Sequence, residues 1–401
     1  MSPNRWPLLC LVCLIAFATS HAAEPEPRDG VSSPFSLRGF GTLGLARSDT
    51  DRTEYVRDLS QPYGLDRDWS ARIDSLIGLQ AEYRFDDRWH AVVQAMSRYR
   101  YDGSYDPEVS WAFVQYEPSP TFNLRLGRLG TEFYMLADSR LVGFANLTVR
   151  PPPDYFGPLV FSYLDGVDAG ASLPIGHGIL QAKLFAGRSP EWSPFYGDIR
   201  WNLDGTLLAG GHLEYVHHPW QVRIGHTEVD FARELPLNQL AGFDVIGLAP
   251  ELSVKDRRVR YDSLGVVYDS GPLQIQLMLS QTEHDSVAYE DTRAGYAIVA
   301  YRLGQITPYL GYSRVSSEPD RLAHPPPPPL DALVSGLTRA THSDQHTWSL
   351  GARWDVYDNI ALKAQIDWVR GSPTSVFPFR GDDIVWDGTM TVYSLALDFV
   401  F

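Results

Sequence analysis

The last eleven residues of the chain, TVYSLALDFVF, set the strictest limit on what it can fold into. In an extended strand every second side chain shares a face. One face of this segment is aromatic and aliphatic: Tyr393, Leu395, Leu397, Phe399 and Phe401. The other face is small or polar: Val392, Ser394, Ala396, Asp398 and Val400. The strand therefore needs an apolar environment on one side only. An edge strand of a soluble β-protein would also meet this need, so the rest of the chain must decide.

The first 22 residues predict a secretory signal peptide. Arg5 supplies a positive charge, the run from Leu8 to Ala18 is apolar, and small residues surround a cleavage site after Ala22. The apolar run is too short to span a membrane as a helix. The sequence therefore predicts an exported protein with residues 1–22 as leader.

Composition narrows the class further. Both cysteines of the chain, Cys10 and Cys13, lie in the predicted leader, which leaves the mature chain without disulfides or thiolate ligands. The net charge of -15 disfavours nucleic acid as a partner. No apolar stretch of about 18 residues follows the leader, so helical membrane spans are excluded. A closed β-barrel is the remaining structure that can cross a membrane, because its backbone groups are all paired.

Short alternating segments recur along the whole mature chain, separated by connections that are short and long in turn. The predicted strands cover 35–47, 72–85, 90–101, 109–117, 122–130, 159–172, 178–188, 206–216, 220–230, 258–269, 272–282, 293–303, 306–316, 346–356, 359–370 and 390–401. Long connections lie on one side, around 131–158, 189–205, 231–257, 317–345 and 371–389. This pattern predicts an all-β fold, a 16-stranded antiparallel transmembrane β-barrel over residues 35–401, preceded by a short periplasmic segment at 23–34.

Several of these features resemble the Gram-negative outer-membrane porins, specifically the proteobacterial general-porin-like family. The resemblance rests on the final strand ending in Phe401 and on the runs GRLGTEFYMLADSRLVG and VRPPPDYFGP, and it covers essentially the whole mature chain. It implies a bacterial outer-membrane location among lipid and lipopolysaccharide, a homotrimer, and a C-terminal strand read by the barrel-assembly machinery. It also implies that the third outer loop, here 131–158, folds into the barrel.

The 131–158 segment is too apolar for a solvated loop and too irregular for a strand. If it folds inward, its acidic residues Glu132, Asp138 and Asp154 are expected to face basic residues on the inner parity of the wall. The predicted pore-lining basic residues are Arg38, Arg84, Arg98, Arg100, Arg125, Arg223, Arg353 and Lys363. Opposed charges of this kind produce a transverse field in a narrow aqueous opening. The alternative is that the charges pair with one another or with the extended loops and only fill the lumen.

The predicted function is passive diffusion of small hydrophilic solutes through a water-filled channel, with no catalysis, cofactor or metal. His217 and His218 are adjacent in a predicted turn, which is a poor arrangement for a metal site. Two alternatives stay open. One is a non-channel barrel with a structural or adhesive role. The other is an outer-membrane hydrolase using Ser280 and His284, which share a strand face, although no catalytic sequence motif accompanies them.

Overall fold

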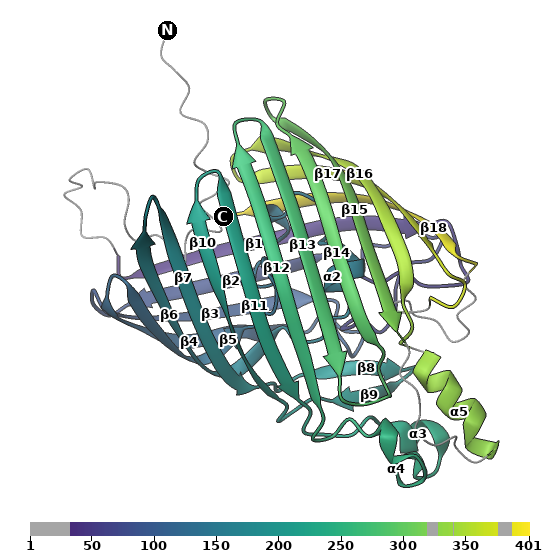
Figure 1. Ribbon diagram of the computed structural model, residues 1–401. Helices are drawn as coiled ribbons and strands as arrows, with labels where there is room; N and C mark the ends of the chain where they lie inside the picture. Colours follow the sequence, from purple (N-terminus) through teal and green to yellow (C-terminus); the bar gives the residue numbers. More distant parts are fainter. Residues whose placement is uncertain (1–32, 319–327, 340, 376–386) are drawn as a thin grey trace.

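The chain folds into a closed barrel of sixteen antiparallel strands (Figure 1). The computed structural model describes residues 33–318, 328–339, 341–375 and 387–401. The barrel strands are β1 (Phe35–Ser48), β2 (Leu76–Arg84), β3 (Trp89–Arg98), β4 (Glu108–Ser119), β5 (Phe122–Gly130), β6 (Tyr163–Ile175), β7 (Gly178–Arg188), β10 (Leu207–His217), β11 (Trp220–Asp230), β12 (Arg258–Ser270), β13 (Leu273–His284), β14 (Asp291–Tyr301), β15 (Ile306–Glu318), β16 (Asp344–Tyr357), β17 (Ile360–Gly371) and β18 (Thr389–Val400). The predicted number of strands and their antiparallel order are confirmed. The predicted signal peptide and residues 23–32 lie outside the described residues.

The barrel closes where β1 meets β18. These strands pair in antiparallel register, with Leu43 opposite Leu397 and Leu45 opposite Leu395. Gly39 and Phe401 exchange backbone hydrogen bonds of 2.8 and 2.9 Å at the end of the seam. Closure leaves the sheet no unpaired edge, which is a condition for a β-structure in lipid.

The side chains of the wall alternate as a membrane barrel requires. On β17, Leu362 and Trp368 are exposed on the outside, whereas Lys363, Gln365 and Asp367 are buried on the inside. The same alternation places Leu184 of β7 on the outside with 70% of its surface exposed and Phe185 inside and buried. An apolar outer face suits hydrocarbon, and a polar inner face suits water.

Connections at the two ends of the barrel differ in length, as predicted. Tight turns join β10 to β11, β12 to β13 and β16 to β17 at one end, where β18 also finishes (Figure 1). The long connections at the other end carry structure that alternation did not predict: the hairpin β8–β9 (Trp192–Tyr196 and Ile199–Asn202), α3 (Leu237–Ala241), α4 (Val245–Leu248), the 3-10 turn η2 (Pro250–Leu252) and α5 (Pro328–Arg339). Among the described residues, no helix has the length and apolarity needed to cross a membrane.

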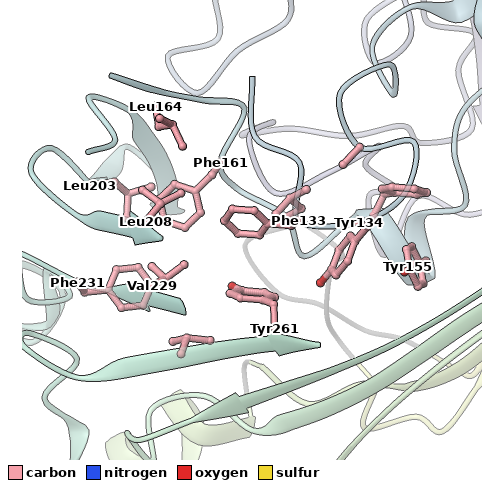
Figure 2. Close-up of a cluster of buried hydrophobic side chains, with 14 of the residues drawn as sticks. Phe133, Tyr134, Tyr155, Phe161, Leu164, Leu203, Leu208, Val229, Phe231 and Tyr261 are labelled. Carbon is pink, nitrogen blue, oxygen red and sulfur yellow. The ribbon is translucent and has the colours of Figure 1, made fainter. Parts of the chain in front are cut away.

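A large apolar cluster joins these long connections to the inner wall. Figure 2 shows Phe133, Tyr134, Tyr155 and Phe161 of the chain between β5 and β6 beside Tyr261 of β12. The ring centroids of Phe133 and Tyr261 are 5.0 Å apart. Trp201 of β9 packs on Phe231 at 4.7 Å in the same cluster. Burial of so many aromatic rings holds the long connections in fixed positions on the barrel.

Candidate functional site

The 131–158 segment runs between β5 and β6 and includes the 3-10 turn η1 (Gly143–Ala145) and the short helix α2 (Pro153–Phe156). Basic side chains of the inner wall hold its backbone. Lys363 Nζ of β17 donates to the carbonyls of Gly143 at 2.7 Å and Thr148 at 3.0 Å. Arg353 Nη1 of β16 donates to the carbonyl of Phe144 at 2.6 Å. These contacts satisfy carbonyl groups that irregular backbone leaves without partners.

Arg150 ties the same segment to two other parts of the barrel. Its side chain is fully buried and donates to both carboxylate oxygens of Asp74, at 3.0 and 2.6 Å. It also lies 3.3 Å from Asp367 of β17 and donates to Ser394 of β18 at 2.7 Å. Burial opposes the charged form, but Asp74 outweighs it, so the pKa of Arg150 lies above its usual range.

The sequence predicted that Asp154 faces a basic side chain, but no ion pair joins it to a basic side chain of the described residues. It is buried, and its carboxylate accepts hydrogen bonds from Ser313 of β15 at 2.6 Å and from Gln345 of β16 at 2.8 Å. The neighbouring Tyr155 packs its ring 5.2 Å from that of Tyr296 of β14. Asp154 therefore fixes the segment to the wall through neutral hydrogen-bond partners.

Glu132 is the centre of the main charged cluster. Its carboxylate lies 2.5 Å from Lys183 of β7, 3.4 Å from Arg125 of β5 and 3.9 Å from Arg223 of β11. His212 of β10 is 3.8 Å away. Burial favours the neutral acid, but Lys183 and its neighbours outweigh it and hold the pKa of Glu132 below its usual range.

Carboxylates of the wall balance the basic members of this cluster. Arg125 makes a bidentate pair with Asp168 of β6, with contacts from 2.5 to 3.0 Å. Arg223 pairs with Glu214 of β10 at 2.5 Å. Asp138 of the segment stands near Arg223, and burial followed by the proximity of Glu132 raises its pKa. The cluster therefore has little net charge.

The structure thus joins Glu132 to two of its predicted partners, Arg125 and Arg223. Sequence reasoning missed four further members: Asp168, Lys183, His212 and Glu214. Lys183 could have been found, because it shares strand parity with Gln181 and Phe185 and opposes the outward Leu184. The acidic wall residues could not be paired in advance, because their partners depend on the register of neighbouring strands.

The remaining predicted basic residues lie away from the acidic residues of the segment. Arg98 pairs with Glu108 at 3.2 Å and donates to Ser60 at 2.9 Å. Arg100 lies beyond the end of β3, not on the wall as predicted, and stands 3.7 Å from Asp102 in the following connection. Arg38 and Arg84 are on the inner parity near the end with short turns, exposed and without an ion pair to any described residue.

Glu191 links the end of the segment to the connection between β7 and β10. Its carboxylate is buried and accepts the backbone N–H of Ser162 at 2.8 Å and of Tyr163 at 3.3 Å. Burial raises the pKa of Glu191 to about 7, with a further contribution from Glu108, although the two N–H groups oppose the shift. This carboxyl therefore titrates in the physiological range.

Three strands share one inner-face order from the short turns towards the long connections. On β7 the order is Gln181, Lys183, Phe185. On β5 it is Asn123, Arg125, Leu129, and on β11 it is Gln221, Arg223, Val229. Amides therefore come first, the charged cluster second, and the apolar cluster of Figure 2 third.

Two serine–histidine arrangements bear on the hydrolase alternative that the sequence left open. Ser280 and His284 are four residues apart on one strand, which separates their backbones by about 13 Å. Another serine, Ser317, does contact His342 and Glu290, but both the serine, at 3.2 Å, and the carboxylate, at 2.7 Å, face the same histidine nitrogen, Nδ1. A relay needs the two ring nitrogens to face different partners. Within the described ranges no group of three or more potential metal ligands is present.

No protein-family model matches the chain, and no curated protein matches it. Solved structures do match over 92% of it. They include the anion-selective porin from Comamonas acidovorans (14% identity, 99% of that chain covered, TM-score 0.55) and Salmonella typhi OmpF in complex with daunomycin (10%, 97%, 0.57). Pseudomonas putida OprB is also similar (9%, 94%, 0.54). Likeness at these identities concerns the fold, and with the apolar outer wall it confirms the predicted location: the chain is a 16-stranded β-barrel of a bacterial outer membrane.

Proposed function

We propose that this protein is a porin, an outer-membrane channel for passive diffusion of small hydrophilic solutes, and that the 131–158 segment narrows it. The observation that carries the proposal is a set of hydrogen bonds between wall side chains and the backbone of the segment: Lys363 and Arg353 donate to its carbonyls, and Gln365 Oε1 accepts the N–H of Val149. These three side chains are on the inner parity of β16 and β17, which supports a position of the segment inside the wall. A 16-stranded barrel is otherwise wide enough for an aqueous passage.

The mechanism needs no bond to be made or broken. The polar inner face replaces bulk water along the path, the segment limits the size of the solute, and the cluster around Glu132 borders the narrow part. Because that cluster pairs acids with bases, it offers local dipoles without a large net field. Solute size and polarity, more than charge, then decide passage.

The proposal extends to assembly in the membrane. The outer wall faces lipid and, at the end with long connections, lipopolysaccharide. A homotrimer and recognition of the C-terminal strand by the barrel-assembly machinery follow from resemblance to porins. Phe399 and Phe401, which lie on the outer face with stacked rings 6.3 Å apart, present the aromatic side of that strand to the membrane.

A barrel without conduction is the second candidate, and one observation favours it. The apolar cluster around Phe133, Phe161 and Tyr261 fills part of the enclosed space at the end with long connections. A barrel stabilised in this way can serve as a structural or adhesive protein that presents its long connections outside the cell. The two candidates differ in whether water and ions pass.

Conductance of the refolded full chain in planar lipid bilayers tests the proposal. Stable current steps in KCl are expected, and hydrolysis of lipid or peptide substrates is not. A folded barrel that gives no current would contradict the channel and favour the structural role. Silence in conductance together with reproducible hydrolysis would instead favour an enzyme.

A further inference from the structure

Five amide side chains project from the inner wall without a partner. They are Gln80 of β2, Asn123 of β5, Gln181 of β7, and Gln274 and Gln276 of β13. Each is half-buried, and none makes a side-chain hydrogen bond to a described residue. We call these five the amide ladder. We propose that the amide ladder makes the channel selective for uncharged, hydroxyl-rich solutes such as sugars and polyols.

This inference rests on the proposed function, and it begins from strand parity. Leu79, Leu124 and Leu277 are exposed on the outer face next to members of the ladder. Alternation therefore turns Gln80, Asn123 and Gln276 towards the interior. The ladder draws on strands distributed around the barrel, so a solute in the bore meets amides from several sides.

Most charged groups of the inner wall are already paired. Arg125 with Asp168, Arg223 with Glu214, and Lys363 with Asp398 form contacts of 2.5 to 2.9 Å. Arg302 pairs with Asp269 at 2.6 Å in the same way. An ion in the bore would have to compete with these partners, and it would lose hydration without gaining an opposite charge.

Among the described residues, charges of the inner parity without an ion pair stand near the end with short turns; they include Arg38, Arg84 and Glu82. Glu82 lies opposite Ser36, and Arg38 lies opposite Gln80, two positions further along the same pair of strands. Charges of both signs therefore stand close together at the barrel end with short turns, which we call the rim. They are partly or fully exposed, and at physiological ionic strength charges in water are screened over about 8 Å. The rim therefore adds little selectivity for ions.

Free amides suit neutral hydroxyl groups for a chemical reason. An amide offers two N–H donors and a carbonyl acceptor, and a hydroxyl group can use either kind of partner. A sugar can therefore exchange hydrogen bonds with water for hydrogen bonds with the ladder at small cost. Several weak sites in sequence allow a solute to enter and to leave, which conduction requires.

Other amides of the chain show the contrast. Gln94 donates to Ser110 at 2.9 Å, and Gln115 donates to Glu117 at 2.6 Å, so both belong to the internal bonding of the wall. Gln281 lies on β13 as well, but it has the opposite parity and bonds to Glu283 at 2.7 Å on the outer face. Gln281 is therefore a matched control on the same strand as Gln274 and Gln276.

Solute flux into proteoliposomes that carry the full chain tests the inference. The probes are a neutral hexose, the aldonate of the same sugar with one carboxylate, and the amino sugar with one ammonium group. The hexose is expected to enter several-fold faster than either charged probe at physiological salt. Equal rates for the three probes would overturn the inference and leave the channel intact, whereas no flux and no KCl current would overturn the proposed function itself.

The double variant Gln274→Leu with Gln276→Leu assigns any preference to the ladder. It should lower hexose flux several-fold while KCl conductance changes little, and Gln281→Leu should leave both unchanged. Gln181→Leu, on another strand, repeats the test if the double variant does not fold. Hexose flux that is unaffected in a folded ladder variant would contradict the assignment.

Discussion

Arg150 Nη2 lies 2.6 Å from Oδ2 of Asp74, and both side chains are buried. The pair joins the 131–158 segment to the residues just before β2, and Asp367 and Ser394 extend it to β17 and β18. A buried ion pair of this kind holds its two chain segments at one distance, because either charge alone would be costly.

Arg150→Ala should therefore loosen the segment and destabilise the barrel. Removing one partner of a buried pair costs about 3 to 5 kcal/mol, because Asp74 and Asp367 are left without compensation. We expect a lower unfolding temperature and larger or noisier current steps, measured by thermal denaturation in detergent and by bilayer recording. Arg88→Ala, at an exposed position in the turn before β3, is the control. Unchanged stability and conductance in Arg150→Ala would show that the pair does not hold the segment.

Glu132→Gln should shift the permeability of the channel towards anions. Around Glu132 three basic side chains, Arg125, Lys183 and Arg223, are balanced by Glu132, Asp168 and Glu214. Loss of one carboxylate leaves a positive excess, and Arg125→Ala should produce the opposite shift. In a hydrated opening, one charge changes the interaction energy of a permeating ion by an amount on the order of 1 kcal/mol. The ratio of anion to cation permeability should then change several-fold. Reversal potentials in a KCl gradient measure it.

The control for the variants Glu132→Gln and Arg125→Ala is Glu228→Gln, which removes a carboxylate from the outer face of β11. Its reversal potential should equal that of the unaltered protein. If Glu132→Gln and Arg125→Ala shift the potential in the same direction, or not at all, the cluster does not border the conducting path.

Glu191 predicts a pH dependence of stability. Its pKa rises from 4.5 to about 7 on folding, so the folded protein holds this proton more tightly than the unfolded chain does. The stabilisation that comes from this proton is fully present below about pH 4.5. It is lost as the pH rises through 7, which lowers the free energy of unfolding by up to about 3 kcal/mol. Unfolding temperatures measured between pH 4 and 8 should fall over this range. Glu191→Gln should flatten the curve, and the exposed Glu318→Gln should not. A slope that survives in Glu191→Gln would assign it to another group.

The apolar cluster predicts a difference between inward and outward aromatic residues. Phe161 has none of its surface exposed, whereas Phe122 projects from the outer face of β5. Phe161→Ala should lower the free energy of unfolding by about 3 to 5 kcal/mol, because a cavity remains in a packed interior. Phe122→Ala should cost much less, because lipid fills the space. Urea titrations of the two folded variants in lipid vesicles give the comparison, and similar costs would mean that the cluster is not tightly packed.

The sequence predicted the barrel well because alternation is a local property of each strand. The observed β17, Ile360–Gly371, nearly coincides with the predicted 359–370, and β11 coincides with 220–230. Alternation carries no information about the structure of the long connections. The sequence therefore did not predict β8, β9 or the helices α3 to α5. Their structure comes from burial of side chains such as Trp201 and Leu330 against distant residues.

The interior was predicted only in part, for a related reason. In the structure Arg125, Arg223, Arg353 and Lys363 lie on the inner parity of their strands. Parity could not show that Lys363 and Arg353 bind backbone carbonyls of the segment, or that Asp154 binds Ser313 and Gln345. Those partners depend on the path of an irregular segment, which no periodic pattern encodes.

The hydrogen bonds between Gly39 and Phe401 lie at the seam where the first strand of the barrel meets the last. Without β18 the cylinder cannot close, so a partly synthesised chain has two unpaired strand edges until β18 is available. Such edges invite pairing with other chains. Delivery across the cell envelope must therefore keep the whole polypeptide unfolded and shielded, and insertion into the bilayer becomes a single late event.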